Sequence, residues 1–199
     1  SFSNCNSLKI FIFSKTVKII KKYHFDFLSQ VEIIIIPETV EEIEEFALSD
    51  CRSIKEIRIL SNIINKIGKG AFSLCSSLKE INIPGTIEYI EELTFSKCSS
   101  LEHIEIPSTI KNIKSSAFYK CTLLQEIILP KSLTEIGSNA FCECHNLTIV
   151  DFSLSTSLQT ISDCAFQNCT SLPEIQLPLS LNNIGNSAFS NCQLFSSIT

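Results

Sequence analysis

Hydrophobic and polar positions follow one pattern that recurs about every 23 residues along the chain. The clearest copy reads AFSLCSSLKEINIPGTIEYI at residues 71–90, and close variants begin at residues 94, 117 and 188. A column of phenylalanines marks the register: Phe2, Phe25, Phe72, Phe95, Phe118, Phe141, Phe166 and Phe189, with Leu48 in the third place. A fixed period of this kind predicts a repeat architecture in which each unit contacts mainly its neighbours.

Each repeat contains two short segments with the character of strands. The first, Leu-x-x-Ile-x-Ile, alternates β-branched positions with polar ones, which predicts a strand of a few residues. The second, Ile-x-x-Ile, is interpreted as another short strand. The Phe and the Cys that lie three residues apart fit a single helical turn, which is too short to be a regular helix.

A proline follows the first strand in most repeats and predicts a sharp turn there. Proline fixes φ and has no N–H for a strand ladder, so it ends the strand. The prolines at this position are Pro37, Pro84, Pro107, Pro130 and Pro178. Two repeats carry Leu60 and Ser153 instead, and these repeats are 24 and 25 residues long. One or two extra residues are therefore expected to make the turn.

The complete unit resembles a known repeat family. Leu-x-x-Ile-x-Ile is the strand signature of leucine-rich repeats, and with Ala-Phe-x-x-Cys before it the unit resembles the 23-residue subtype of BspA-like surface proteins of bacteria and protozoa. The pattern departs from this subtype at His24, Leu28 and Leu48. We expect a leucine-rich-repeat solenoid, a right-handed stack of about eight 23-residue coils. Its concave face would carry a parallel β-sheet, with short strands and single helical turns elsewhere.

Charges on the Ile-x-x-Ile segments support stacking in register. Aligned coils place opposite charges side by side in five pairs: Lys18–Glu41, Lys21–Glu44, Glu42–Lys66, Glu88–Lys111 and Glu91–Lys114. Such neighbours favour in-register pairing.

Composition narrows the functional classes. Hydrophobic content of 44% supports a continuous core, and a net charge of −5 with no basic run beyond Lys21-Lys22 gives no footprint for nucleic acid. No apolar stretch approaches the roughly 20 residues of a membrane-spanning helix, so this segment is not expected to insert into a membrane. Ser1 and Thr199 both lie inside a repeat, and residues 1–199 are expected to be one solenoid, truncated at both ends, from a longer chain.

Most of the ten cysteines share one column, which favours packing over chemistry. Its members are Cys5, Cys51, Cys75, Cys98, Cys121, Cys144, Cys169 and Cys192. Because free cysteine is among the most buried residue types, these thiols are expected to be buried and unpaired. Cys142 and Cys164 lie outside the column and are the candidates for reactive thiols.

No catalytic, cofactor or metal site is predicted. The only cluster with zinc-ligand character is Cys142-x-Cys144-His145, and Cys144 is already assigned to the core. The acidic run EEIEE at residues 41–45 is interpreted as a solvated face. The sequence contains none of the common catalytic or phosphate-binding motifs, and we expect the chain not to be an enzyme.

The outward strand positions are the candidate binding surface, because solenoids bind partners on the face built from their parallel strands. In the first two repeats these positions form an apolar patch, which marks an interaction site unless a preceding segment covers it or the end repeat is poorly ordered. The candidate binding residues are Ile10, Ile12, Ile33, Ile35, Arg58, Glu80, Asn82, His103, Glu105 and Glu126.

Three functions are compatible with this pattern. The first is a non-enzymatic protein-binding module; the resemblance places it at a cell surface or outside the cell, in adhesion to host cells or matrix proteins. The second is an intracellular, cytoplasmic scaffold or regulatory repeat protein. The third is the recognition arm of a larger enzyme. A signal peptide with a membrane anchor elsewhere in the reading frame would favour the first, and a catalytic motif would favour the third.

Overall fold

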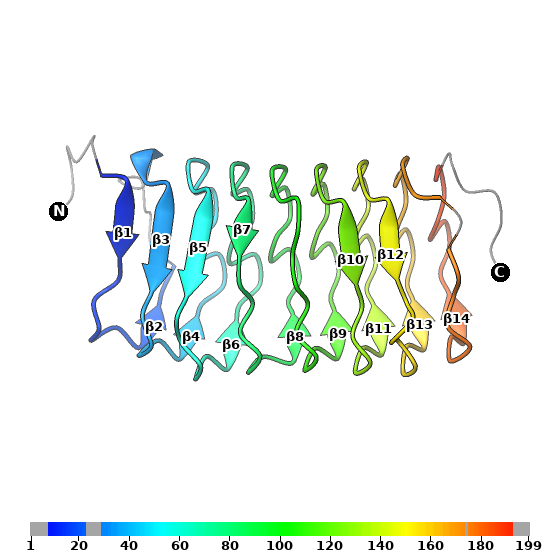
Figure 1. Cartoon of the computed structure of the whole chain (residues 1–199), viewed down its shortest axis with the longest axis horizontal. Helices are drawn as coiled ribbons and strands as arrows, with labels where there is room; N and C mark the ends of the chain where they lie inside the picture. Colours follow the sequence, from blue (N-terminus) through cyan, green and yellow to red (C-terminus); the bar gives the residue numbers. More distant parts are fainter. Residues whose placement is uncertain (1–7, 23–28, 174, 193–199) are drawn as a thin grey trace.

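The protein is a stack of coils in which two rows of short parallel strands run along the stack (Figure 1). The structure, a computed structural model, describes residues 8–22, 29–173 and 175–192. The first row comprises β1 (Ile10–Ile12), β3 (Ile33–Ile36), β5 (Glu56–Ile59), β7 (Glu80–Ile81), β10 (Glu126–Ile128) and β12 (Ile149–Asp151). These strands come from the Leu-x-x-Ile-x-Ile segments, as expected.

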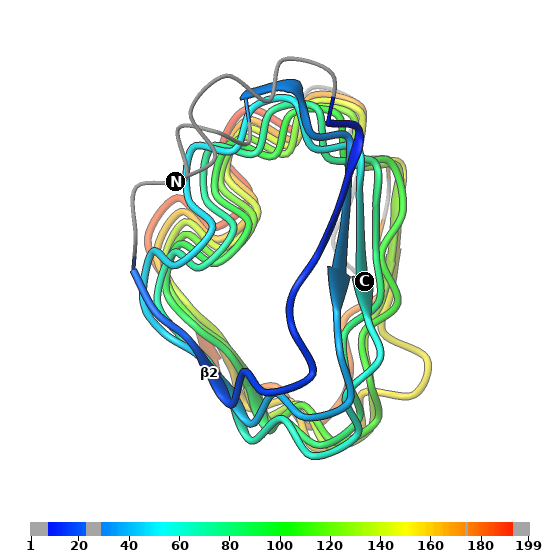
Figure 2. The same cartoon turned by 90° about the vertical axis from the view of Figure 1, so that its left-hand side faces the viewer.

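The second row comes from the Ile-x-x-Ile segments and confirms that they are strands. Its members are β2 (Ile19–Ile20), β4 (Glu42–Ile43), β6 (Lys66–Ile67), β8 (Tyr89–Ile90), β9 (Asn112–Ile113), β11 (Glu135–Ile136), β13 (Thr160–Ile161) and β14 (Asn183–Ile184). Seen along the stack, this row lies across the interior of the coil from the first (Figure 2). Every pairing is parallel and joins residues at the same position of successive repeats.

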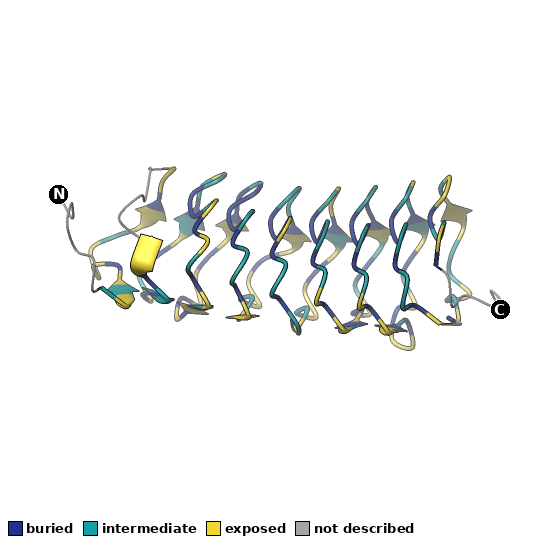
Figure 3. Cartoon of the chain, turned by 90° about the horizontal axis from the view of Figure 1, so that it is seen from above, coloured by how far each residue is buried: buried dark blue, intermediate teal, exposed yellow. Residues whose placement is uncertain are grey.

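The side chains that point into the coil form one continuous core. Buried residues recur at the same places in each coil (Figure 3). The phenylalanine column runs through this core, with Leu48 followed by a stack of aromatic rings from Phe72 onward. The ring centroid of Phe118 lies 5.3 Å from that of Phe95 and 5.1 Å from that of Phe141. Phe2 and Phe25, predicted for the same column, lie outside the described residues.

The segment around each Phe differs from the single helical turn that the sequence predicts. It is a series of overlapping turns in which the residues two before and two after the Phe have positive φ, between 52° and 64°. In the coil of Phe118 these are Ser116 and Lys120, whose N–H groups donate to the carbonyls of Ser138 and Cys142 in the next coil. Left-handed backbone is costly for residues other than glycine, and this third ladder between coils holds it. Among the described residues there is no α-helix, and residues 29–30 form a short 3₁₀ turn.

The proline turns form as predicted and contain a further contact between coils. The N–H of Ile110 donates to the carbonyl of Pro107, and the equivalent bond follows the other four prolines. Two residues after each proline, a Thr or Ser hydroxyl donates to a carbonyl of the preceding coil; the residues are Thr39, Thr86, Thr109, Ser132 and Ser180. Each proline turn is thereby tied to the coil before it.

Ion pairs confirm the predicted register in four of the five cases. The N–O distances are 3.0 Å for Lys18–Glu41, 2.7 Å for Glu42–Lys66, 2.8 Å for Glu88–Lys111 and 2.7 Å for Glu91–Lys114. Lys21 and Glu44 do not form the fifth pair. On the first row, Glu32 accepts hydrogen bonds from Lys55 and Lys9, each at 2.7 Å, and these two ammonium groups lower the pKa of the Glu32 carboxyl to about 2.

In the described residues, the first row lacks a predicted strand at residues 103–106, and in the last repeat Ile175 forms only an isolated bridge. Residues 103–106 make no backbone hydrogen bond to the coils on either side, so the row divides into β1-β3-β5-β7 and β10-β12. The inward Ile104 is nevertheless buried. Period-two alternation therefore fixes which side chains enter the core, and it does not by itself fix the ladder of backbone bonds.

Candidate protein-binding face

The outward side of the first row, together with residues 103–106, is named here the strand face. Alternation along each strand decides its composition, because successive side chains point to opposite sides. Ile34 and Ile36 of β3 are fully buried, whereas Ile33 and Ile35, which alternate with them, are half-buried and point outward. The structure places all ten candidate binding residues on this face or in the groove that crosses it.

The four candidate isoleucines form one patch over two adjacent strands. Ile10 pairs with Ile33 and Ile12 pairs with Ile35 in the register of β1 and β3. Ile10 is 49% exposed and Ile12 is 61% exposed. The two isoleucines of β3 are more covered because this strand lies between β1 and β5. We call these four residues the isoleucine patch.

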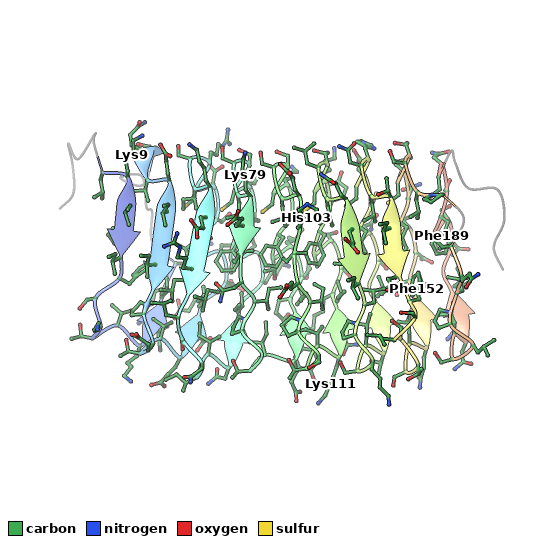
Figure 4. All side chains as sticks on the ribbon, viewed as in Figure 1. Lys9, Lys79, His103, Lys111, Phe152 and Phe189 are labelled. Atoms are coloured by element: carbon green, nitrogen blue, oxygen red, sulfur yellow. The ribbon has the colours of Figure 1, made fainter. Side chains whose placement is uncertain are left out.

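A groove of about 1000 Å³ crosses the strand face beyond the patch. The other six candidate residues all line it: Arg58, Glu80, Asn82, His103, Glu105 and Glu126. Of these, His103 is labelled in Figure 4. They come from four successive coils, and residues 103–106, which form no first-row strand, run through the middle of the groove. Because β3 pairs with β5, the patch and the groove belong to one continuous surface.

Carboxylates outnumber cationic side chains in the groove. Glu56 and Arg58 of β5 are hydrogen-bonded to each other, with one N–O distance of 3.0 Å, and this contact raises the pKa of the Arg58 guanidinium. Glu80, Glu105 and Glu126 form no ion pair among the residues that the structure describes. The cation Lys131 lines the groove as well. The surface is therefore acidic.

The side chain of Asn82 is held by hydrogen bonds to the backbone of the preceding coil. Its Nδ2 donates to the carbonyl of Ile59 at 2.8 Å, and its Oδ1 accepts from the N–H of Ile59 at 2.8 Å. The side-chain amide thus takes the place of a backbone partner beyond the end of β7. Asn82 shapes the groove, and its own hydrogen-bonding groups are already engaged.

Two apolar residues of the groove were missing from the candidate residues. Ile128 is 48% exposed and Leu154 is 58% exposed, and both line the groove. Leu154 belongs to the 25-residue repeat, whose extra residues form a loop that projects beyond the other coils (Figure 2). The longer period signals this loop in the sequence, but only the folded coil shows that it bends towards the strand face.

The column cysteines are buried donors. In six of them the Sγ–H donates to the carbonyl of the phenylalanine-column residue in the preceding coil, at 3.1–3.3 Å, whereas Sγ of Cys51 lies 3.9 Å from the carbonyl oxygen of Ser49. The six are Cys75, Cys98, Cys121, Cys144, Cys169 and Cys192. Nine of the ten cysteines lie in the described part of the chain, and none of the nine is in a disulfide. Cys5 lies outside it.

The cluster with zinc-ligand character is committed to other contacts. Cys144 donates to the carbonyl of Phe118, and the His145 ring Nδ1 lies 3.0 Å from the carbonyl oxygen of Asn168. No group of three His, Cys, Asp or Glu side chains in the described ranges is arranged to hold a metal ion.

The prediction of two reactive thiols needs one correction. Cys142 is buried, because its side chain packs between coils with Sγ 3.9 Å from Oε1 of Gln167, and burial raises the pKa of this thiol to about 11. Cys164 is only half-buried. Since the thiolate is the nucleophile, a raised pKa suppresses reaction at neutral pH.

Thiol labelling of the native protein is therefore expected to modify Cys164 first and to leave the column cysteines and Cys142 unlabelled until denaturant is added. Burial raises the pKa of Cys98 to about 12, and it acts in the same direction on Cys121, Cys144, Cys169 and Cys192. Mass mapping of labelled peptides, with and without denaturant, measures the order. Rapid native labelling along the column would contradict the burial described above.

The family assignment rests on the whole length of the chain. The family model for the BspA-type leucine-rich repeat region, with six repeat copies, matches residues 1–123 and again residues 91–199. The chain belongs to the BspA-type leucine-rich repeat family. A member of this family is a repeat module for protein interaction. The comparison with curated protein sequences gives no match.

Solved structures of leucine-rich repeat proteins share this fold. A leucine-rich repeat protein of Treponema pallidum, TpLRR, is 26% identical with a TM-score of 0.74, over 83% of this chain and 78% of that one. A leucine-rich cell surface protein of Faecalibacterium prausnitzii is 27% identical with a TM-score of 0.64, over 98% of this chain and 48% of its own. A leucine-rich repeat protein of Eubacterium ventriosum is 26% identical with a TM-score of 0.60, over 92% of this chain and 42% of its own. The chain thus spans less than half of the last two proteins.

No helix in the described residues has both the length and the apolar character needed to cross a bilayer.

Proposed function

We propose that this chain is a non-enzymatic protein-binding module that acts at a cell surface, in adhesion to host cells or matrix proteins. The observation that carries the proposal is the isoleucine patch, which is continuous with the groove. Exposed apolar surface costs free energy in water unless a partner covers it, and contiguous patches mark interaction sites. The similar protein of F. prausnitzii is a leucine-rich cell surface protein, and this supports the proposed location at a cell surface.

The cysteines are compatible with an oxidising environment. Free thiols are unusual in proteins outside the cell, where disulfides form readily. The six column thiols from Cys75 to Cys192 are buried and hydrogen-bonded to backbone carbonyls, and their pKa values are raised, so little thiolate is present to oxidise. The array therefore needs neither a reducing compartment nor disulfides to keep its core intact.

Adhesion is tested with beads that carry the purified chain and are added to cultured epithelial cells and to immobilised matrix proteins. Replacement of both Ile33 and Ile35 by Thr is expected to reduce bead adhesion, because it removes apolar contact area worth roughly 25 cal/mol per Å² and keeps the β-branched shape that the strand prefers. The matched control is Ile19→Thr with Ile184→Thr, the same change at exposed strand positions of the second row. Antibody labelling of intact, unpermeabilised cells that make the parent protein tests its location. Equal adhesion of all three proteins, or an absence of surface labelling, would contradict the proposal.

A further inference from the structure

We infer that the groove binds an extended, positively charged segment of a partner protein, with one apolar side chain of that segment seated against Ile128 and Leu154. The inference rests on the proposed protein-binding function and adds the chemistry of the partner. It is carried by the groove's unpaired carboxylates, by the register in which they are stacked and by the apolar end of the groove.

The carboxylates of the groove differ from those of the second row in their partners. On the second row, Glu41, Glu42 and Glu88 each form an ion pair with a lysine of a neighbouring coil. In the groove, Glu80, Glu105 and Glu126 have no such neighbour. A cationic partner would supply the missing charges and gain electrostatic steering from the acidic surface.

The register adds a second argument. Glu56 of β5 pairs directly with Glu80 of β7, and like charges directly opposite each other in a sheet are unfavourable. Arg58 is hydrogen-bonded to Glu56 and interacts with Glu80 only through a longer-range charge attraction, so Glu80 has no ion pair of its own in the described part of the chain. A surface shaped for stability alone would place a lysine at this position, as the second row does. A local conflict of this kind is expected where the surface serves binding.

The apolar end of the groove sets a direction for the occupant. Ile128 and Leu154 are both about half exposed or more and lie at the end where the loop of the 25-residue repeat projects. From the coil of Glu56 to the coil that carries this loop there are four spacings of about 4.8 Å, or about 19 Å. An extended chain covers this length with about six residues at about 3.3 Å per residue. A short segment with several cations and one apolar residue near one end therefore matches the groove.

The test uses a fluorescein-labelled heptapeptide, Lys-Gly-Lys-Gly-Lys-Leu-Lys, and fluorescence anisotropy at low and at physiological ionic strength. The structure predicts saturable binding that weakens as salt is added, because the charges are exposed and screened. A peptide with Glu in place of every Lys is expected not to bind. A peptide with Ala in place of Leu is expected to bind about three- to ten-fold more weakly, since it loses apolar contact area.

Variants locate the binding. Glu80→Gln with Glu126→Gln is expected to weaken binding about 5- to 20-fold at low salt, from two exposed charge contacts. Glu38→Gln with Glu135→Gln removes the same net charge outside the groove and is expected to leave binding within about two-fold. Leu154→Ser is expected to weaken binding about three- to ten-fold, whereas Leu123→Ser, at an exposed position outside the groove, is not.

Equal losses in the two charge variants would mean diffuse attraction and would overturn the inference, as would tight binding of the acidic peptide or no binding of the basic one. An unchanged affinity of Leu154→Ser would overturn it as well. The proposed protein-binding function is tested independently of the groove. If the basic peptide fails to bind while Ile33→Thr with Ile35→Thr still reduces bead adhesion, the inferred groove ligand is wrong and the proposed function is not contradicted.

Discussion

Replacement of Phe118 by alanine is expected to lower the free energy of unfolding by about 3–5 kcal/mol, the range for emptying a fully buried aromatic site. Phe118 is fully buried and stacks on Phe95 and Phe141, so truncation leaves a void between three coils. Stability in a repeat array is carried by contacts between neighbours, and a void at the centre breaks two of these interfaces at once. Denaturant unfolding followed by circular dichroism measures the loss.

The control for this prediction comes from the array itself. Leu48 occupies the same column and is also fully buried, so the column accepts leucine. Phe118→Leu is expected to cost about 1–1.5 kcal/mol, as volume-conserving apolar exchanges do. Equal losses for the alanine and leucine variants, or a loss below about 1 kcal/mol for alanine, would show that the ring stack contributes little to stability.

The sequence predicts those parts of the fold that depend on side-chain period. Ile34 and Ile36 enter the core and Ile33 and Ile35 leave it because a strand alternates, and that follows from the letters alone. The pair Glu88–Lys111 follows from stacking in register. The prolines mark their turns because the ring removes the N–H that a longer strand would need.

The parts that sequence reasoning missed depend on the backbone between coils. Ser116 and Lys120 have left-handed backbone although neither is glycine, because hydrogen bonds to the next coil hold them there, and such bonds leave no signature in residue type. Residues 103–106 keep the alternating pattern and yet form no strand. Cys142 lies outside the cysteine column and is still buried, because Gln167 of the next coil covers it.

The candidate site was predicted in its location and not in its shape. Outward positions on successive strands can be read from the repeat, and this placed Arg58, Glu80 and Glu126 together on one face. The groove depends on two further features: residues 103–106, which form no first-row strand, and the loop that carries Leu154. A 25-residue period reveals that a loop exists, but its direction depends on packing against the neighbouring coils.

Replacement of Ile34 by alanine is expected to cost about 2–5 kcal/mol of stability, whereas replacement of its neighbour Ile33 by threonine is expected to change stability by about 0.5 kcal/mol or less. Ile34 is fully buried between Phe11 and Ile57 in the strand register, so truncation leaves a cavity in the core. Ile33 points outward between Ile10 and Glu56, where threonine keeps the β-branched backbone preference and places its hydroxyl in water.

Thermal melts of the two single variants, with hydrogen exchange on β3, measure this difference. A loss for Ile33→Thr as large as that for Ile34→Ala would mean that the outward isoleucines are part of the core. The isoleucine patch would then be no binding surface, and recognition would rest on the acidic groove alone. If Ile33→Thr is nearly neutral while Ile34→Ala is strongly destabilising, the outward isoleucine at position 33 contributes little to folding. The same reasoning applies to its neighbours in the isoleucine patch, and binding to a partner then explains why this exposed surface is apolar.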